Sequence, residues 1–151
     1  MIRPARRDDL ATIGELIRAL ADYEDMAADV VWTLDQLDEH LFGPQPAAQV
    51  TLACDDTHGG VVGMALWFRT FSTFLGRPGI WLEDLFVRPE ARGRGHGLAL
   101  LRHLRSLTDG RVEWSVLDWN TPSIELYEQL GARPLEGWTT YRWLGDGPGG
   151  A

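Results

Sequence analysis

The sequence predicts an α/β fold in which helices cover both faces of a mixed sheet. Segments whose apolar residues recur every three or four positions alternate with short apolar segments typical of strands. Their order is strand, helix, helix, three strands, helix, strand, helix, strand. With 151 residues, of which 44% are hydrophobic, the chain is long enough for one folded core. A glycine-rich turn at residues 92–97 separates one of these strands from the helix that follows it.

The N-terminal segment is predicted to form a short strand and then a helix. The strand begins at Ile2, and Asp8 or Asp9 can cap the helix. The apolar residues of this helix share one face, as the spacing of Leu10, Ile13, Leu16, Ile17 and Leu20 requires. A single apolar face indicates a helix that packs against the sheet.

A second helix and two strands follow. Thr33 and Gln36 have the spacing of a capping box, in which each side chain binds the backbone N–H of the other residue. This helix is expected to extend through about residue 41. Residues 49–55 and 61–69 are expected to be strands joined by a hairpin loop, and residues 70–79 to be a longer loop.

The C-terminal half alternates strands with helices. We expect strands at residues 81–87, 112–117 and 139–144, a helix from about residue 98, and another from residue 123 to residue 130 that ends at Gly131. The helix after the glycine turn buries one face, formed by Leu98, Leu101, Leu104 and Leu107. One domain is expected to span residues 1–144, and the glycine-rich tail at residues 145–151 to be disordered.

The net charge of −8 argues against nucleic acid as a partner, because phosphate backbones bind clustered arginine and lysine. It suits a small cationic substrate attracted by an acidic cleft, and it suits solubility alone equally well. Many of the acids lie between residues 22 and 39, where they form either a solvated surface or a rim that receives a cation. They are Asp22, Glu24, Asp25, Asp29, Asp35, Asp38 and Glu39.

The cysteine and histidine content bears on compartment and metal binding. The single cysteine, Cys54, excludes an internal disulfide framework and fits a core position in a strand. The N-terminus lacks the apolar core of a signal peptide, and no apolar run approaches the roughly 20 residues of a membrane-spanning helix. We therefore expect a cytoplasmic protein that binds no membrane. The four histidines lack the spacing of metal ligands, so no metal is expected.

The glycine-rich turn predicts a phosphate-binding site. Gly93, Gly95 and Gly97 leave backbone N–H groups uncovered at the N-terminus of a helix, where the helix dipole also attracts anions. A dinucleotide-binding fingerprint would need a glycine in place of Leu98, and a P-loop would need Lys and then Ser or Thr after Gly97. Both readings fail on spacing. From the glycines alone, an ordinary tight turn stays open.

The context of the turn resembles the GNAT acetyltransferase superfamily. Arg92, Gly95 and Gly97 match its R/Q-x-x-G-x-G/A pattern, directly after an apolar strand. W-L-E-D-L-F-V before the turn and D-W-N-T-P-S-I-E-L-Y-E-Q-L-G-A after the next strand resemble the spermidine/spermine (diamine) N-acetyltransferase branch. Shorter matches are R-P-A-x-x-x-D near the N-terminus, A-D-Y-E at residues 21–24 and E-G-W at residues 136–138. The resemblance covers nearly the whole chain apart from the tail.

The resemblance implies the GNAT fold, a mixed and mostly antiparallel sheet splayed between two strands, with acetyl-CoA as the co-substrate. In that family the turn's amides hold the pyrophosphate, and the backbone of the preceding strand hydrogen-bonds the pantetheine arm. Carried over position by position, the cofactor-binding residues are Leu85, Phe86, Val87, Arg92, Gly93, Arg94, Gly95, His96, Gly97, Leu98, Asn120, Pro122 and Ser123. His96 departs from the branch, which usually has an apolar residue there.

The resemblance also implies direct attack of the acceptor amine on the thioester. Tyr127 matches the tyrosine that protonates the departing thiolate, and a phenol with a pKa of about 10 can protonate a thiolate with a pKa of about 8.5. Glu83 matches a strand glutamate that faces the substrate, either as the base or as a partner of the ammonium. Its apolar neighbours are expected to raise its pKa by desolvation, and strand alternation places Asp84 on the opposite face. The backbone N–H of Phe86 or Val87 is the candidate donor to the oxyanion.

Acceptor-binding residues are carried over in the same way, with two tryptophans added as aromatic walls for an ammonium. They are Tyr23, Glu24, Glu83, Trp114, Trp119 and Glu136, and Asp118 is a second candidate for the role of Glu83. The implied acceptor is a small cationic amine, either a di- or polyamine or a lysine-like amino acid, and the implied assembly is a homodimer. An aminoglycoside acceptor, a protein or peptide amine, and a non-catalytic coenzyme A sensor stay open as alternatives.

Overall fold

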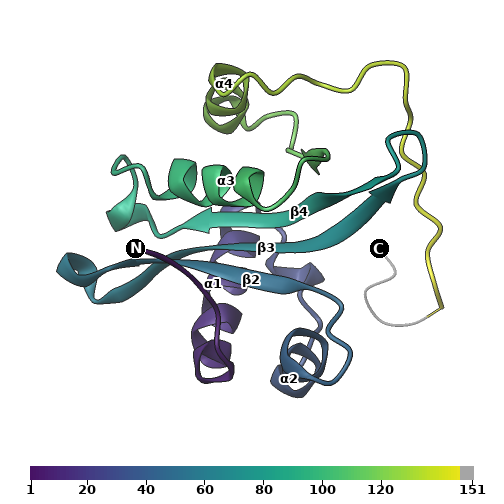
Figure 1. The fold of residues 1–151 in the computed structure, drawn as a ribbon. Helices are drawn as coiled ribbons and strands as arrows, with labels where there is room; N and C mark the ends of the chain where they lie inside the picture. The colour runs from purple at the N-terminus through teal and green to yellow at the C-terminus, as the bar shows by residue number, and fades with distance from the viewer. Residues whose placement is uncertain (147–151) are drawn as a thin grey trace. The chain divides into compact units, whose positions relative to one another are not determined.

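The computed structural model describes residues 1–146 (Figure 1). The chain divides into two compact units, Met1–Glu113 and Trp114–Ala151. The expectation of one domain over residues 1–144 stays a prediction. Of the tail expected to be disordered, residues 147–151 lie outside the described residues, and residues 145 and 146 are exposed and form no helix or strand.

A five-stranded sheet with the order β1-β2-β3-β4-β5 forms the centre of the first unit. The strands are β1 (Ile2–Pro4), β2 (Gln49–Asp55), β3 (Gly60–Ser72), β4 (Arg77–Val87) and β5 (Val112–Trp114). The first four strands pair antiparallel, each with its neighbour in the chain. The mixed, mostly antiparallel sheet expected from the sequence is therefore confirmed.

Two helices cover one face of this sheet and a third covers the other, as Figure 1 shows. These are α1 (Leu10–Tyr23) and α2 (Leu34–Phe42) on one face and α3 (His96–Ser106) on the other; α4 (Thr121–Gln129) belongs to the second unit. Single 3-10 turns occur at Arg7–Asp9, Ala27–Asp29, Asp56–His58 and Pro89–Ala91. The predicted capping box of α2 is confirmed: the Thr33 N–H donates to Gln36 Oε1 at 2.9 Å, and the Gln36 N–H donates to Thr33 Oγ1 at 3.3 Å.

The core between α1 and the sheet is built from the residues that the helical spacing predicts. Ile13, Leu16 and Leu20 are buried together with sheet residues, in a cluster completed by Leu41, Val50, Leu52, Cys54, Met64 and Phe86. On the opposite face α3 buries Leu100, Leu101 and Leu104. Each buried aliphatic side chain contributes about 1.5–3 kcal/mol to folding, so both layers of helix are held firmly to the sheet.

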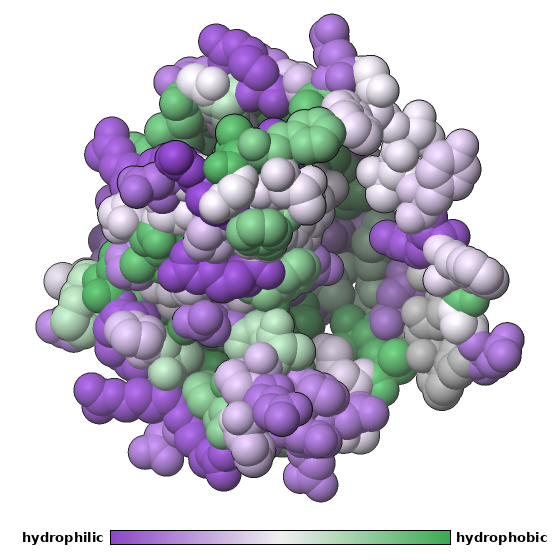
Figure 2. Space-filling model, turned by 45° about the vertical axis from the view of Figure 1, so that its right-hand side comes forward, coloured by the Kyte–Doolittle hydropathy of each residue, from purple (hydrophilic) through white to green (hydrophobic). Residues whose placement is uncertain are grey.

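The prediction that residues 70–79 form a loop is mostly wrong. β3 continues to Ser72 and β4 begins at Arg77, because the antiparallel ladder persists through the pairs Phe71–Pro78 and Ser72–Arg77. The side chains at this end of the hairpin are largely solvated, with Phe71 67% and Phe74 90% exposed. Apolar side chains are visible among polar ones on the molecular surface in Figure 2. Backbone pairing alone extends the hairpin beyond the buried part of the sheet.

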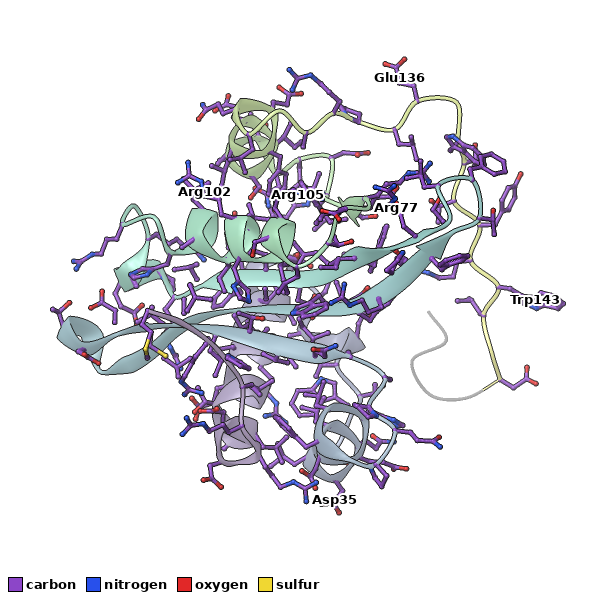
Figure 3. The ribbon with its side chains drawn as sticks, in the orientation of Figure 1. Asp35, Arg77, Arg102, Arg105, Glu136 and Trp143 are labelled. Atoms are coloured by element: carbon purple, nitrogen blue, oxygen red, sulfur yellow. The ribbon has the colours of Figure 1, made fainter. Side chains whose placement is uncertain are left out.

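Two strands predicted in the C-terminal part are also corrected. The strand expected at residues 112–117 is shorter, since β5 ends at Trp114, and residues 139–144 form no strand in the described chain. Their aromatic residues are solvent-exposed, Tyr141 at 92% and Trp143 at 101%, and Figure 3 shows Trp143 pointing away from its segment. A strand needs a neighbour to accept and donate its backbone hydrogen bonds, and high β-propensity does not replace that neighbour.

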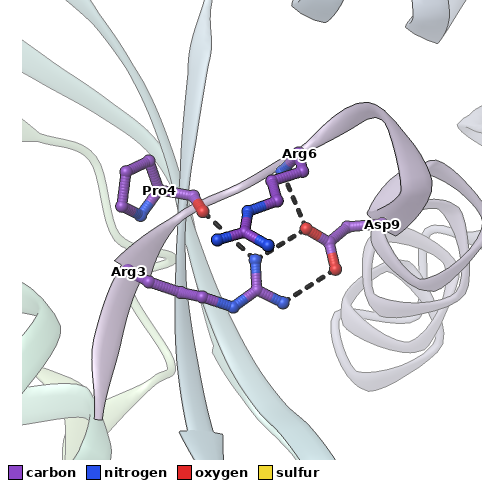
Figure 4. Close-up of polar contacts among 4 residues, drawn as sticks. All are labelled: Arg3, Pro4, Arg6 and Asp9. Atoms are coloured by element: carbon purple, nitrogen blue, oxygen red, sulfur yellow. Dashed lines mark hydrogen bonds and ion pairs between the residues drawn. The ribbon is translucent and has the colours of Figure 1, made fainter.

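A partly buried ion pair joins β1 to the start of α1 (Figure 4). The Arg3 guanidinium donates to both carboxylate oxygens of Asp9, at 2.7 and 2.8 Å, and the Arg6 N–H donates to the same carboxylate at 2.7 Å. These bonds, with the Arg3 contribution largest, lower the pKa of Asp9. Asp9 is at the N-cap of α1, as predicted, but it binds Arg3 and Arg6 instead of a backbone N–H of the helix.

No helix in the described chain is long and apolar enough to cross a membrane.

Candidate functional site

The glycine turn presents open backbone at the start of α3. Gly93 and Gly95 have φ values of 76° and 85°, in the left-handed region that favours glycine, and Gly95 is the N-cap of α3. A β-carbon at either position would have no atom within 4 Å, so backbone conformation and not crowding selects glycine there. The first N–H groups of a helix lack partners within the helix. The turn therefore offers uncovered donors at the positive end of the helix dipole, as a phosphate site requires.

Arg92 connects this turn to β4 and to the end of α1. Its Nε donates to the Val87 carbonyl at 2.9 Å, and its guanidinium lies over the rings of Tyr23 and Phe86, at 5.0 and 5.5 Å from their centroids. Contacts of this kind contribute about 0.5–2 kcal/mol each. Arg92 thus positions the turn against the strand; its contact with the cofactor stays a prediction.

His96 anchors the first turn of α3 to the end of β2. Its Nε2 lies 3.3 Å from the Asp55 Oδ2, and the two side chains are only 15% and 16% exposed. The imidazole where the branch usually has an apolar residue is therefore paired with a carboxylate on the neighbouring strand. The predicted use of the His96 backbone by the cofactor is compatible with that pairing.

A β-bulge interrupts β4 at Glu83. Leu66 pairs with Asp84, whereas its neighbour Trp67 pairs with Leu82, so Glu83 is the extra residue of the ladder. Residues that pair across an antiparallel ladder point to the same face of the sheet. Asp84 therefore shares the face of Leu66, and Leu82 shares the opposite face with Trp67. Leu82 and Asp84, which a regular strand would place on one face, point to opposite faces.

This bulge corrects the predicted roles of the two neighbouring carboxyls. Trp81 pairs with Phe68 and so lies on the face of Asp84, and its Nε1 donates to Glu83 Oε2 at 2.9 Å. Glu83 and Asp84 thus both reach the side of the sheet that α1 covers, and the expectation that they point to opposite faces is wrong. The expected burial of Glu83 is also wrong, because its side chain is exposed.

Asp84 is the less exposed of the two neighbouring carboxyls on this strand. Burial raises its pKa from 3.8 to about 6, with smaller contributions from the negative charges of Glu83 and Glu24. Burial also raises the pKa of Glu24, at the end of α1. The predicted acceptor residues Glu24 and Glu83 therefore lie close enough to Asp84 to act on its charge. The alternation of a regular strand had placed Asp84 on the opposite face of β4 from Glu83. Strand periodicity cannot reveal a bulge, so the sequence carried no signal for this placement.

Two glycines bring the starts of β4 and β5 together, a packing role that the sequence did not reveal. The Ile80 N–H donates to the Arg111 carbonyl at 2.8 Å. A β-carbon on Gly79 would lie 2.6 Å from the Arg111 oxygen, and one on Gly110 would lie 2.1 Å from the Pro78 oxygen. Both distances are too short for any side chain, so this close approach of backbones requires glycine. This contact between the strands lies at the beginning of β4, well before Leu85–Val87.

The predicted site residues from Trp114 onwards belong to the second unit. The Trp114 and Tyr127 rings meet edge to face, 4.9 Å between centroids. Asn120, the N-cap of α4, is buried, and its Oδ1 has no hydrogen-bond partner among the residues that the structure describes. Pro122 and Ser123 lie in the first turn of α4, and Asp118, Trp119 and Glu136 are exposed, the last of these labelled in Figure 3. The meeting of these residues with the glycine turn stays a prediction.

A cavity of about 410 Å³ in the first unit is lined by none of the predicted site residues. It is lined by the start of β4, including Arg77 (labelled in Figure 3), by Arg69 and by the turn between α3 and β5. Arg69 donates to the Leu107 carbonyl at 3.2 Å, and Arg105 donates to the Thr108 and Gly110 carbonyls, so these arginines bind the C-terminal carbonyls of α3 and its turn.

Within residues 1–146, no group of three or more His, Cys, Asp or Glu side chains is arranged to hold a metal ion.

Comparison with known proteins identifies the family. The model of the "Acetyltransferase (GNAT) family" matches residues 16–132. This chain belongs to that family. It is 36% identical to a thialysine N-epsilon-acetyltransferase of Bos taurus, over 97% of this chain and 93% of the other. It is also 40% identical to an L-ornithine N5-acetyltransferase of Arabidopsis thaliana, over 57% of this chain and 40% of that protein.

Solved structures agree with this assignment of the fold. An integron cassette protein from the mobile metagenome of V. cholerae superposes on 97% of this chain with a TM-score of 0.77 and 24% identity, and 93% of that protein is covered. The GNAT fold, the resemblance to this family and the prediction of an acetyltransferase are confirmed. Acetyltransferases of this family use acetyl-CoA.

Proposed function

We propose that this GNAT protein transfers the acetyl group of acetyl-CoA to a primary amine of a small cationic acceptor, either a lysine-like amino acid or a di- or polyamine. The observation that carries the proposal is the set of carboxyls on one face of β4 and at the end of α1, beside the turn that suits a pyrophosphate. Glu24, Glu83 and Asp84 interact electrostatically there. Relatives named for thialysine and ornithine act on amines at the end of a short carbon chain, which is consistent with such a site.

The residues present fit acetyl-CoA, which supplies an acetyl group activated as a thioester. The N–H groups of residues 93–98 would hold the pyrophosphate, since open space lies over Gly93 and Gly95. The backbone of Leu85–Val87 would hydrogen-bond the pantetheine arm on the side not paired with β3. Asn120, Pro122 and Ser123 would provide further contacts at the start of α4.

The reaction requires three groups of this chain. A carboxylate takes a proton from the acceptor's ammonium, which frees the nitrogen lone pair to form the new C–N bond. The N–H of Phe86 or Val87 donates to the carbonyl oxygen as negative charge develops on it. As the C–S bond breaks, the Tyr127 hydroxyl gives its proton to the departing thiolate. Cys54 is buried in the core cluster, which favours a direct transfer over an acetylated cysteine.

We also propose that two copies of the chain associate, as the resemblance to the diamine branch implies. The segment after α4 exposes several large apolar side chains: Leu135, Trp138, Tyr141, Trp143 and Leu144. Exposed apolar groups in a row favour burial against a partner. Light scattering coupled to size exclusion tests this directly, and a monomeric mass at micromolar concentration would refute it.

An acceptor screen tests the proposed function. Acetyl-CoA consumption is measured with thialysine, lysine, ornithine, spermidine, putrescine, an aminoglycoside and a short peptide. We expect turnover with small cationic amines and its loss, by about 10²-fold or more, in Tyr127→Phe. Turnover confined to the aminoglycoside or the peptide would refute the proposed acceptor class. Stabilisation by acetyl-CoA without turnover of any amine would instead indicate a coenzyme A sensor.

A further inference from the structure

We infer that Asp84, and not Glu83, is the carboxyl group that takes the proton from the acceptor's ammonium. This inference rests on the proposed function and deepens it by assigning the base. Glu83 then has a different task, which is to attract the cation at the solvent edge of the site. The assignment is carried by the register of β4, the burial of the two side chains and the charges that face them.

The register of β4 places Asp84 on the side where the acceptor residues lie. Its ladder partner Leu66 packs against the core cluster that contains the buried face of α1, so Asp84 points to the α1 side of the sheet. The end of α1 carries Tyr23 and Glu24. On the same side, the Arg92 guanidinium lies over the rings of Tyr23 and Phe86, which ties the end of α1 to the residues that follow Asp84.

Burial and bonding separate the two carboxyls. Glu83 is exposed and accepts a hydrogen bond from Trp81 Nε1, so its charge is solvated and partly satisfied. Asp84 is half-buried, and in the described chain no side chain donates a hydrogen bond to it or forms an ion pair with it. A carboxylate withdrawn from water without a donor is unfavourable unless it binds a cation or a proton. An acceptor ammonium satisfies both needs, first as the cation and then as the proton source.

The charges around Asp84 favour uptake of a proton at that position. Glu83 from its own strand and Glu24 at the end of α1 both act on it with negative charge. Arg92, in the turn after β4, is engaged with the Val87 carbonyl and two aromatic rings. The pKa of Asp84 rises to about 6, close to the neutral pH at which a base must accept and then release a proton. Glu83 and Glu24 keep the negative potential that draws in the ammonium.

The decisive experiment compares three matched amide substitutions. Asp84→Asn and Glu83→Gln each replace a carboxyl by an amide of the same shape, and Asp8→Asn, at an exposed site away from β4, is the control. kcat and kcat/KM are measured from pH 5 to 9 with the best acceptor of the screen. We expect Asp84→Asn to lose about 10²–10⁴-fold in kcat and to lose the fall in rate below pH 6–7. Glu83→Gln should raise KM and keep that acidic limb.

A second measurement keeps the inference falsifiable if Asp84→Asn folds poorly. Acceptor binding to the acetyl-CoA-bound wild type and to Glu83→Gln is measured calorimetrically in buffers with different ionisation enthalpies, which reports proton exchange on binding. Proton exchange retained in Glu83→Gln supports Asp84, whereas its loss there overturns the inference. An Asp84→Asn variant with wild-type kcat and acidic limb would also overturn it.

Different results would refute the proposed function and the assignment of Asp84 as the base. If the wild type acetylates only a peptide or an aminoglycoside, the proposed acceptor is wrong, and the same variants are then assayed with that acceptor. If the wild type acetylates small amines and Glu83→Gln alone removes the acidic limb, the proposed function stands and Asp84 is not the base. Stabilisation by acetyl-CoA, measured for each variant, confirms that the cofactor site is intact.

Discussion

Replacing Asp84 by asparagine should stabilise this protein at neutral pH. A carboxyl whose pKa is raised on folding binds its proton more tightly in the folded state than in the unfolded chain. Its contribution to stability is therefore fully present below the unfolded pKa and is lost as pH rises through the folded pKa. For Asp84 these limits are 3.8 and about 6. Asparagine stays neutral at every pH and avoids that loss.

The size of the effect follows from the same shift. Each pKa unit corresponds to about 1.36 kcal/mol, so the change from 3.8 to about 6 sets an upper limit of about 3 kcal/mol above pH 7. Partial solvation lowers the expected gain to about 2 kcal/mol. For a chain of this length that gain raises Tm by about 4–8 °C.

Urea unfolding followed by tryptophan fluorescence, from pH 4 to pH 8, measures this difference. The free energies of unfolding of wild type and Asp84→Asn should nearly coincide at pH 4, diverge mainly between pH 4 and 6, and differ by a constant amount above about pH 7. Asp8→Asn, at a solvated carboxyl, should follow the wild type throughout. An asparagine variant that is less stable at pH 8, or a difference that does not vary with pH, would refute the burial of Asp84 and with it the argument for this residue as the base. A stabilised but inactive variant is the combination expected when a functional residue is kept at a cost in stability.

Three further predictions concern the turn, the start of the sheet and the N-terminus. Gly95→Ala should lower stability by about 1–2 kcal/mol and weaken the thermal shift produced by acetyl-CoA, because φ is 85° there. Gly97→Ala should leave stability nearly unchanged, since its new β-carbon would be 3.8 Å from its nearest neighbour. Equal stability losses in the two variants would contradict this prediction. Gly110→Ala should lower the free energy of unfolding by about 1–3 kcal/mol or prevent folding, because its β-carbon would lie 2.1 Å from a carbonyl oxygen of β4. A variant with the wild-type Tm would be inconsistent with the close approach of β4 and β5. Asp9→Asn should cost about 1.5–3 kcal/mol at pH 7 through loss of its bonds to Arg3. Since the pKa of Asp9 is lowered on folding, the difference in free energy of unfolding between wild type and Asp9→Asn should shrink as pH falls below 3.8. Urea unfolding at pH 3 and pH 7 measures this difference, and an equal value at both pH values would contradict the prediction.

Local signals predicted much of the fold. The capping box at Thr33 and Gln36 and the helical spacing from Leu10 to Leu20 depend on residues within three turns of each other, and both elements form where expected. The strand at Gln49–Asp55 has the bounds that its apolar pattern indicates. The glycine turn also forms where expected, with Gly93 and Gly95 in the left-handed region at the start of α3.

Features that depend on pairing partners could not be predicted in this way. The hairpin is longer than its apolar pattern because register, and not burial, carries the ladder past Phe71. The aromatic segment at residues 139–144 reads as a strand, yet it has no neighbouring strand in the described chain. The bulge at Glu83 follows from the register between two strands distant in sequence, so the orientations of Glu83 and Asp84 could not be read from either strand alone.

The bulge has a consequence for how this site can change over time. Glu83 is the residue that the ladder passes over, since Leu66 and Trp67 pair with Asp84 and Leu82 on either side of it. Deleting its codon would join two segments that already pair correctly, and β4 downstream would keep its register with β3. A single insertion or deletion at this position could therefore alter the charge offered to the acceptor while leaving the Leu85–Val87 backbone and the glycine turn in place. Acceptor preference could then diverge among such proteins without any change in the part that binds acetyl-CoA.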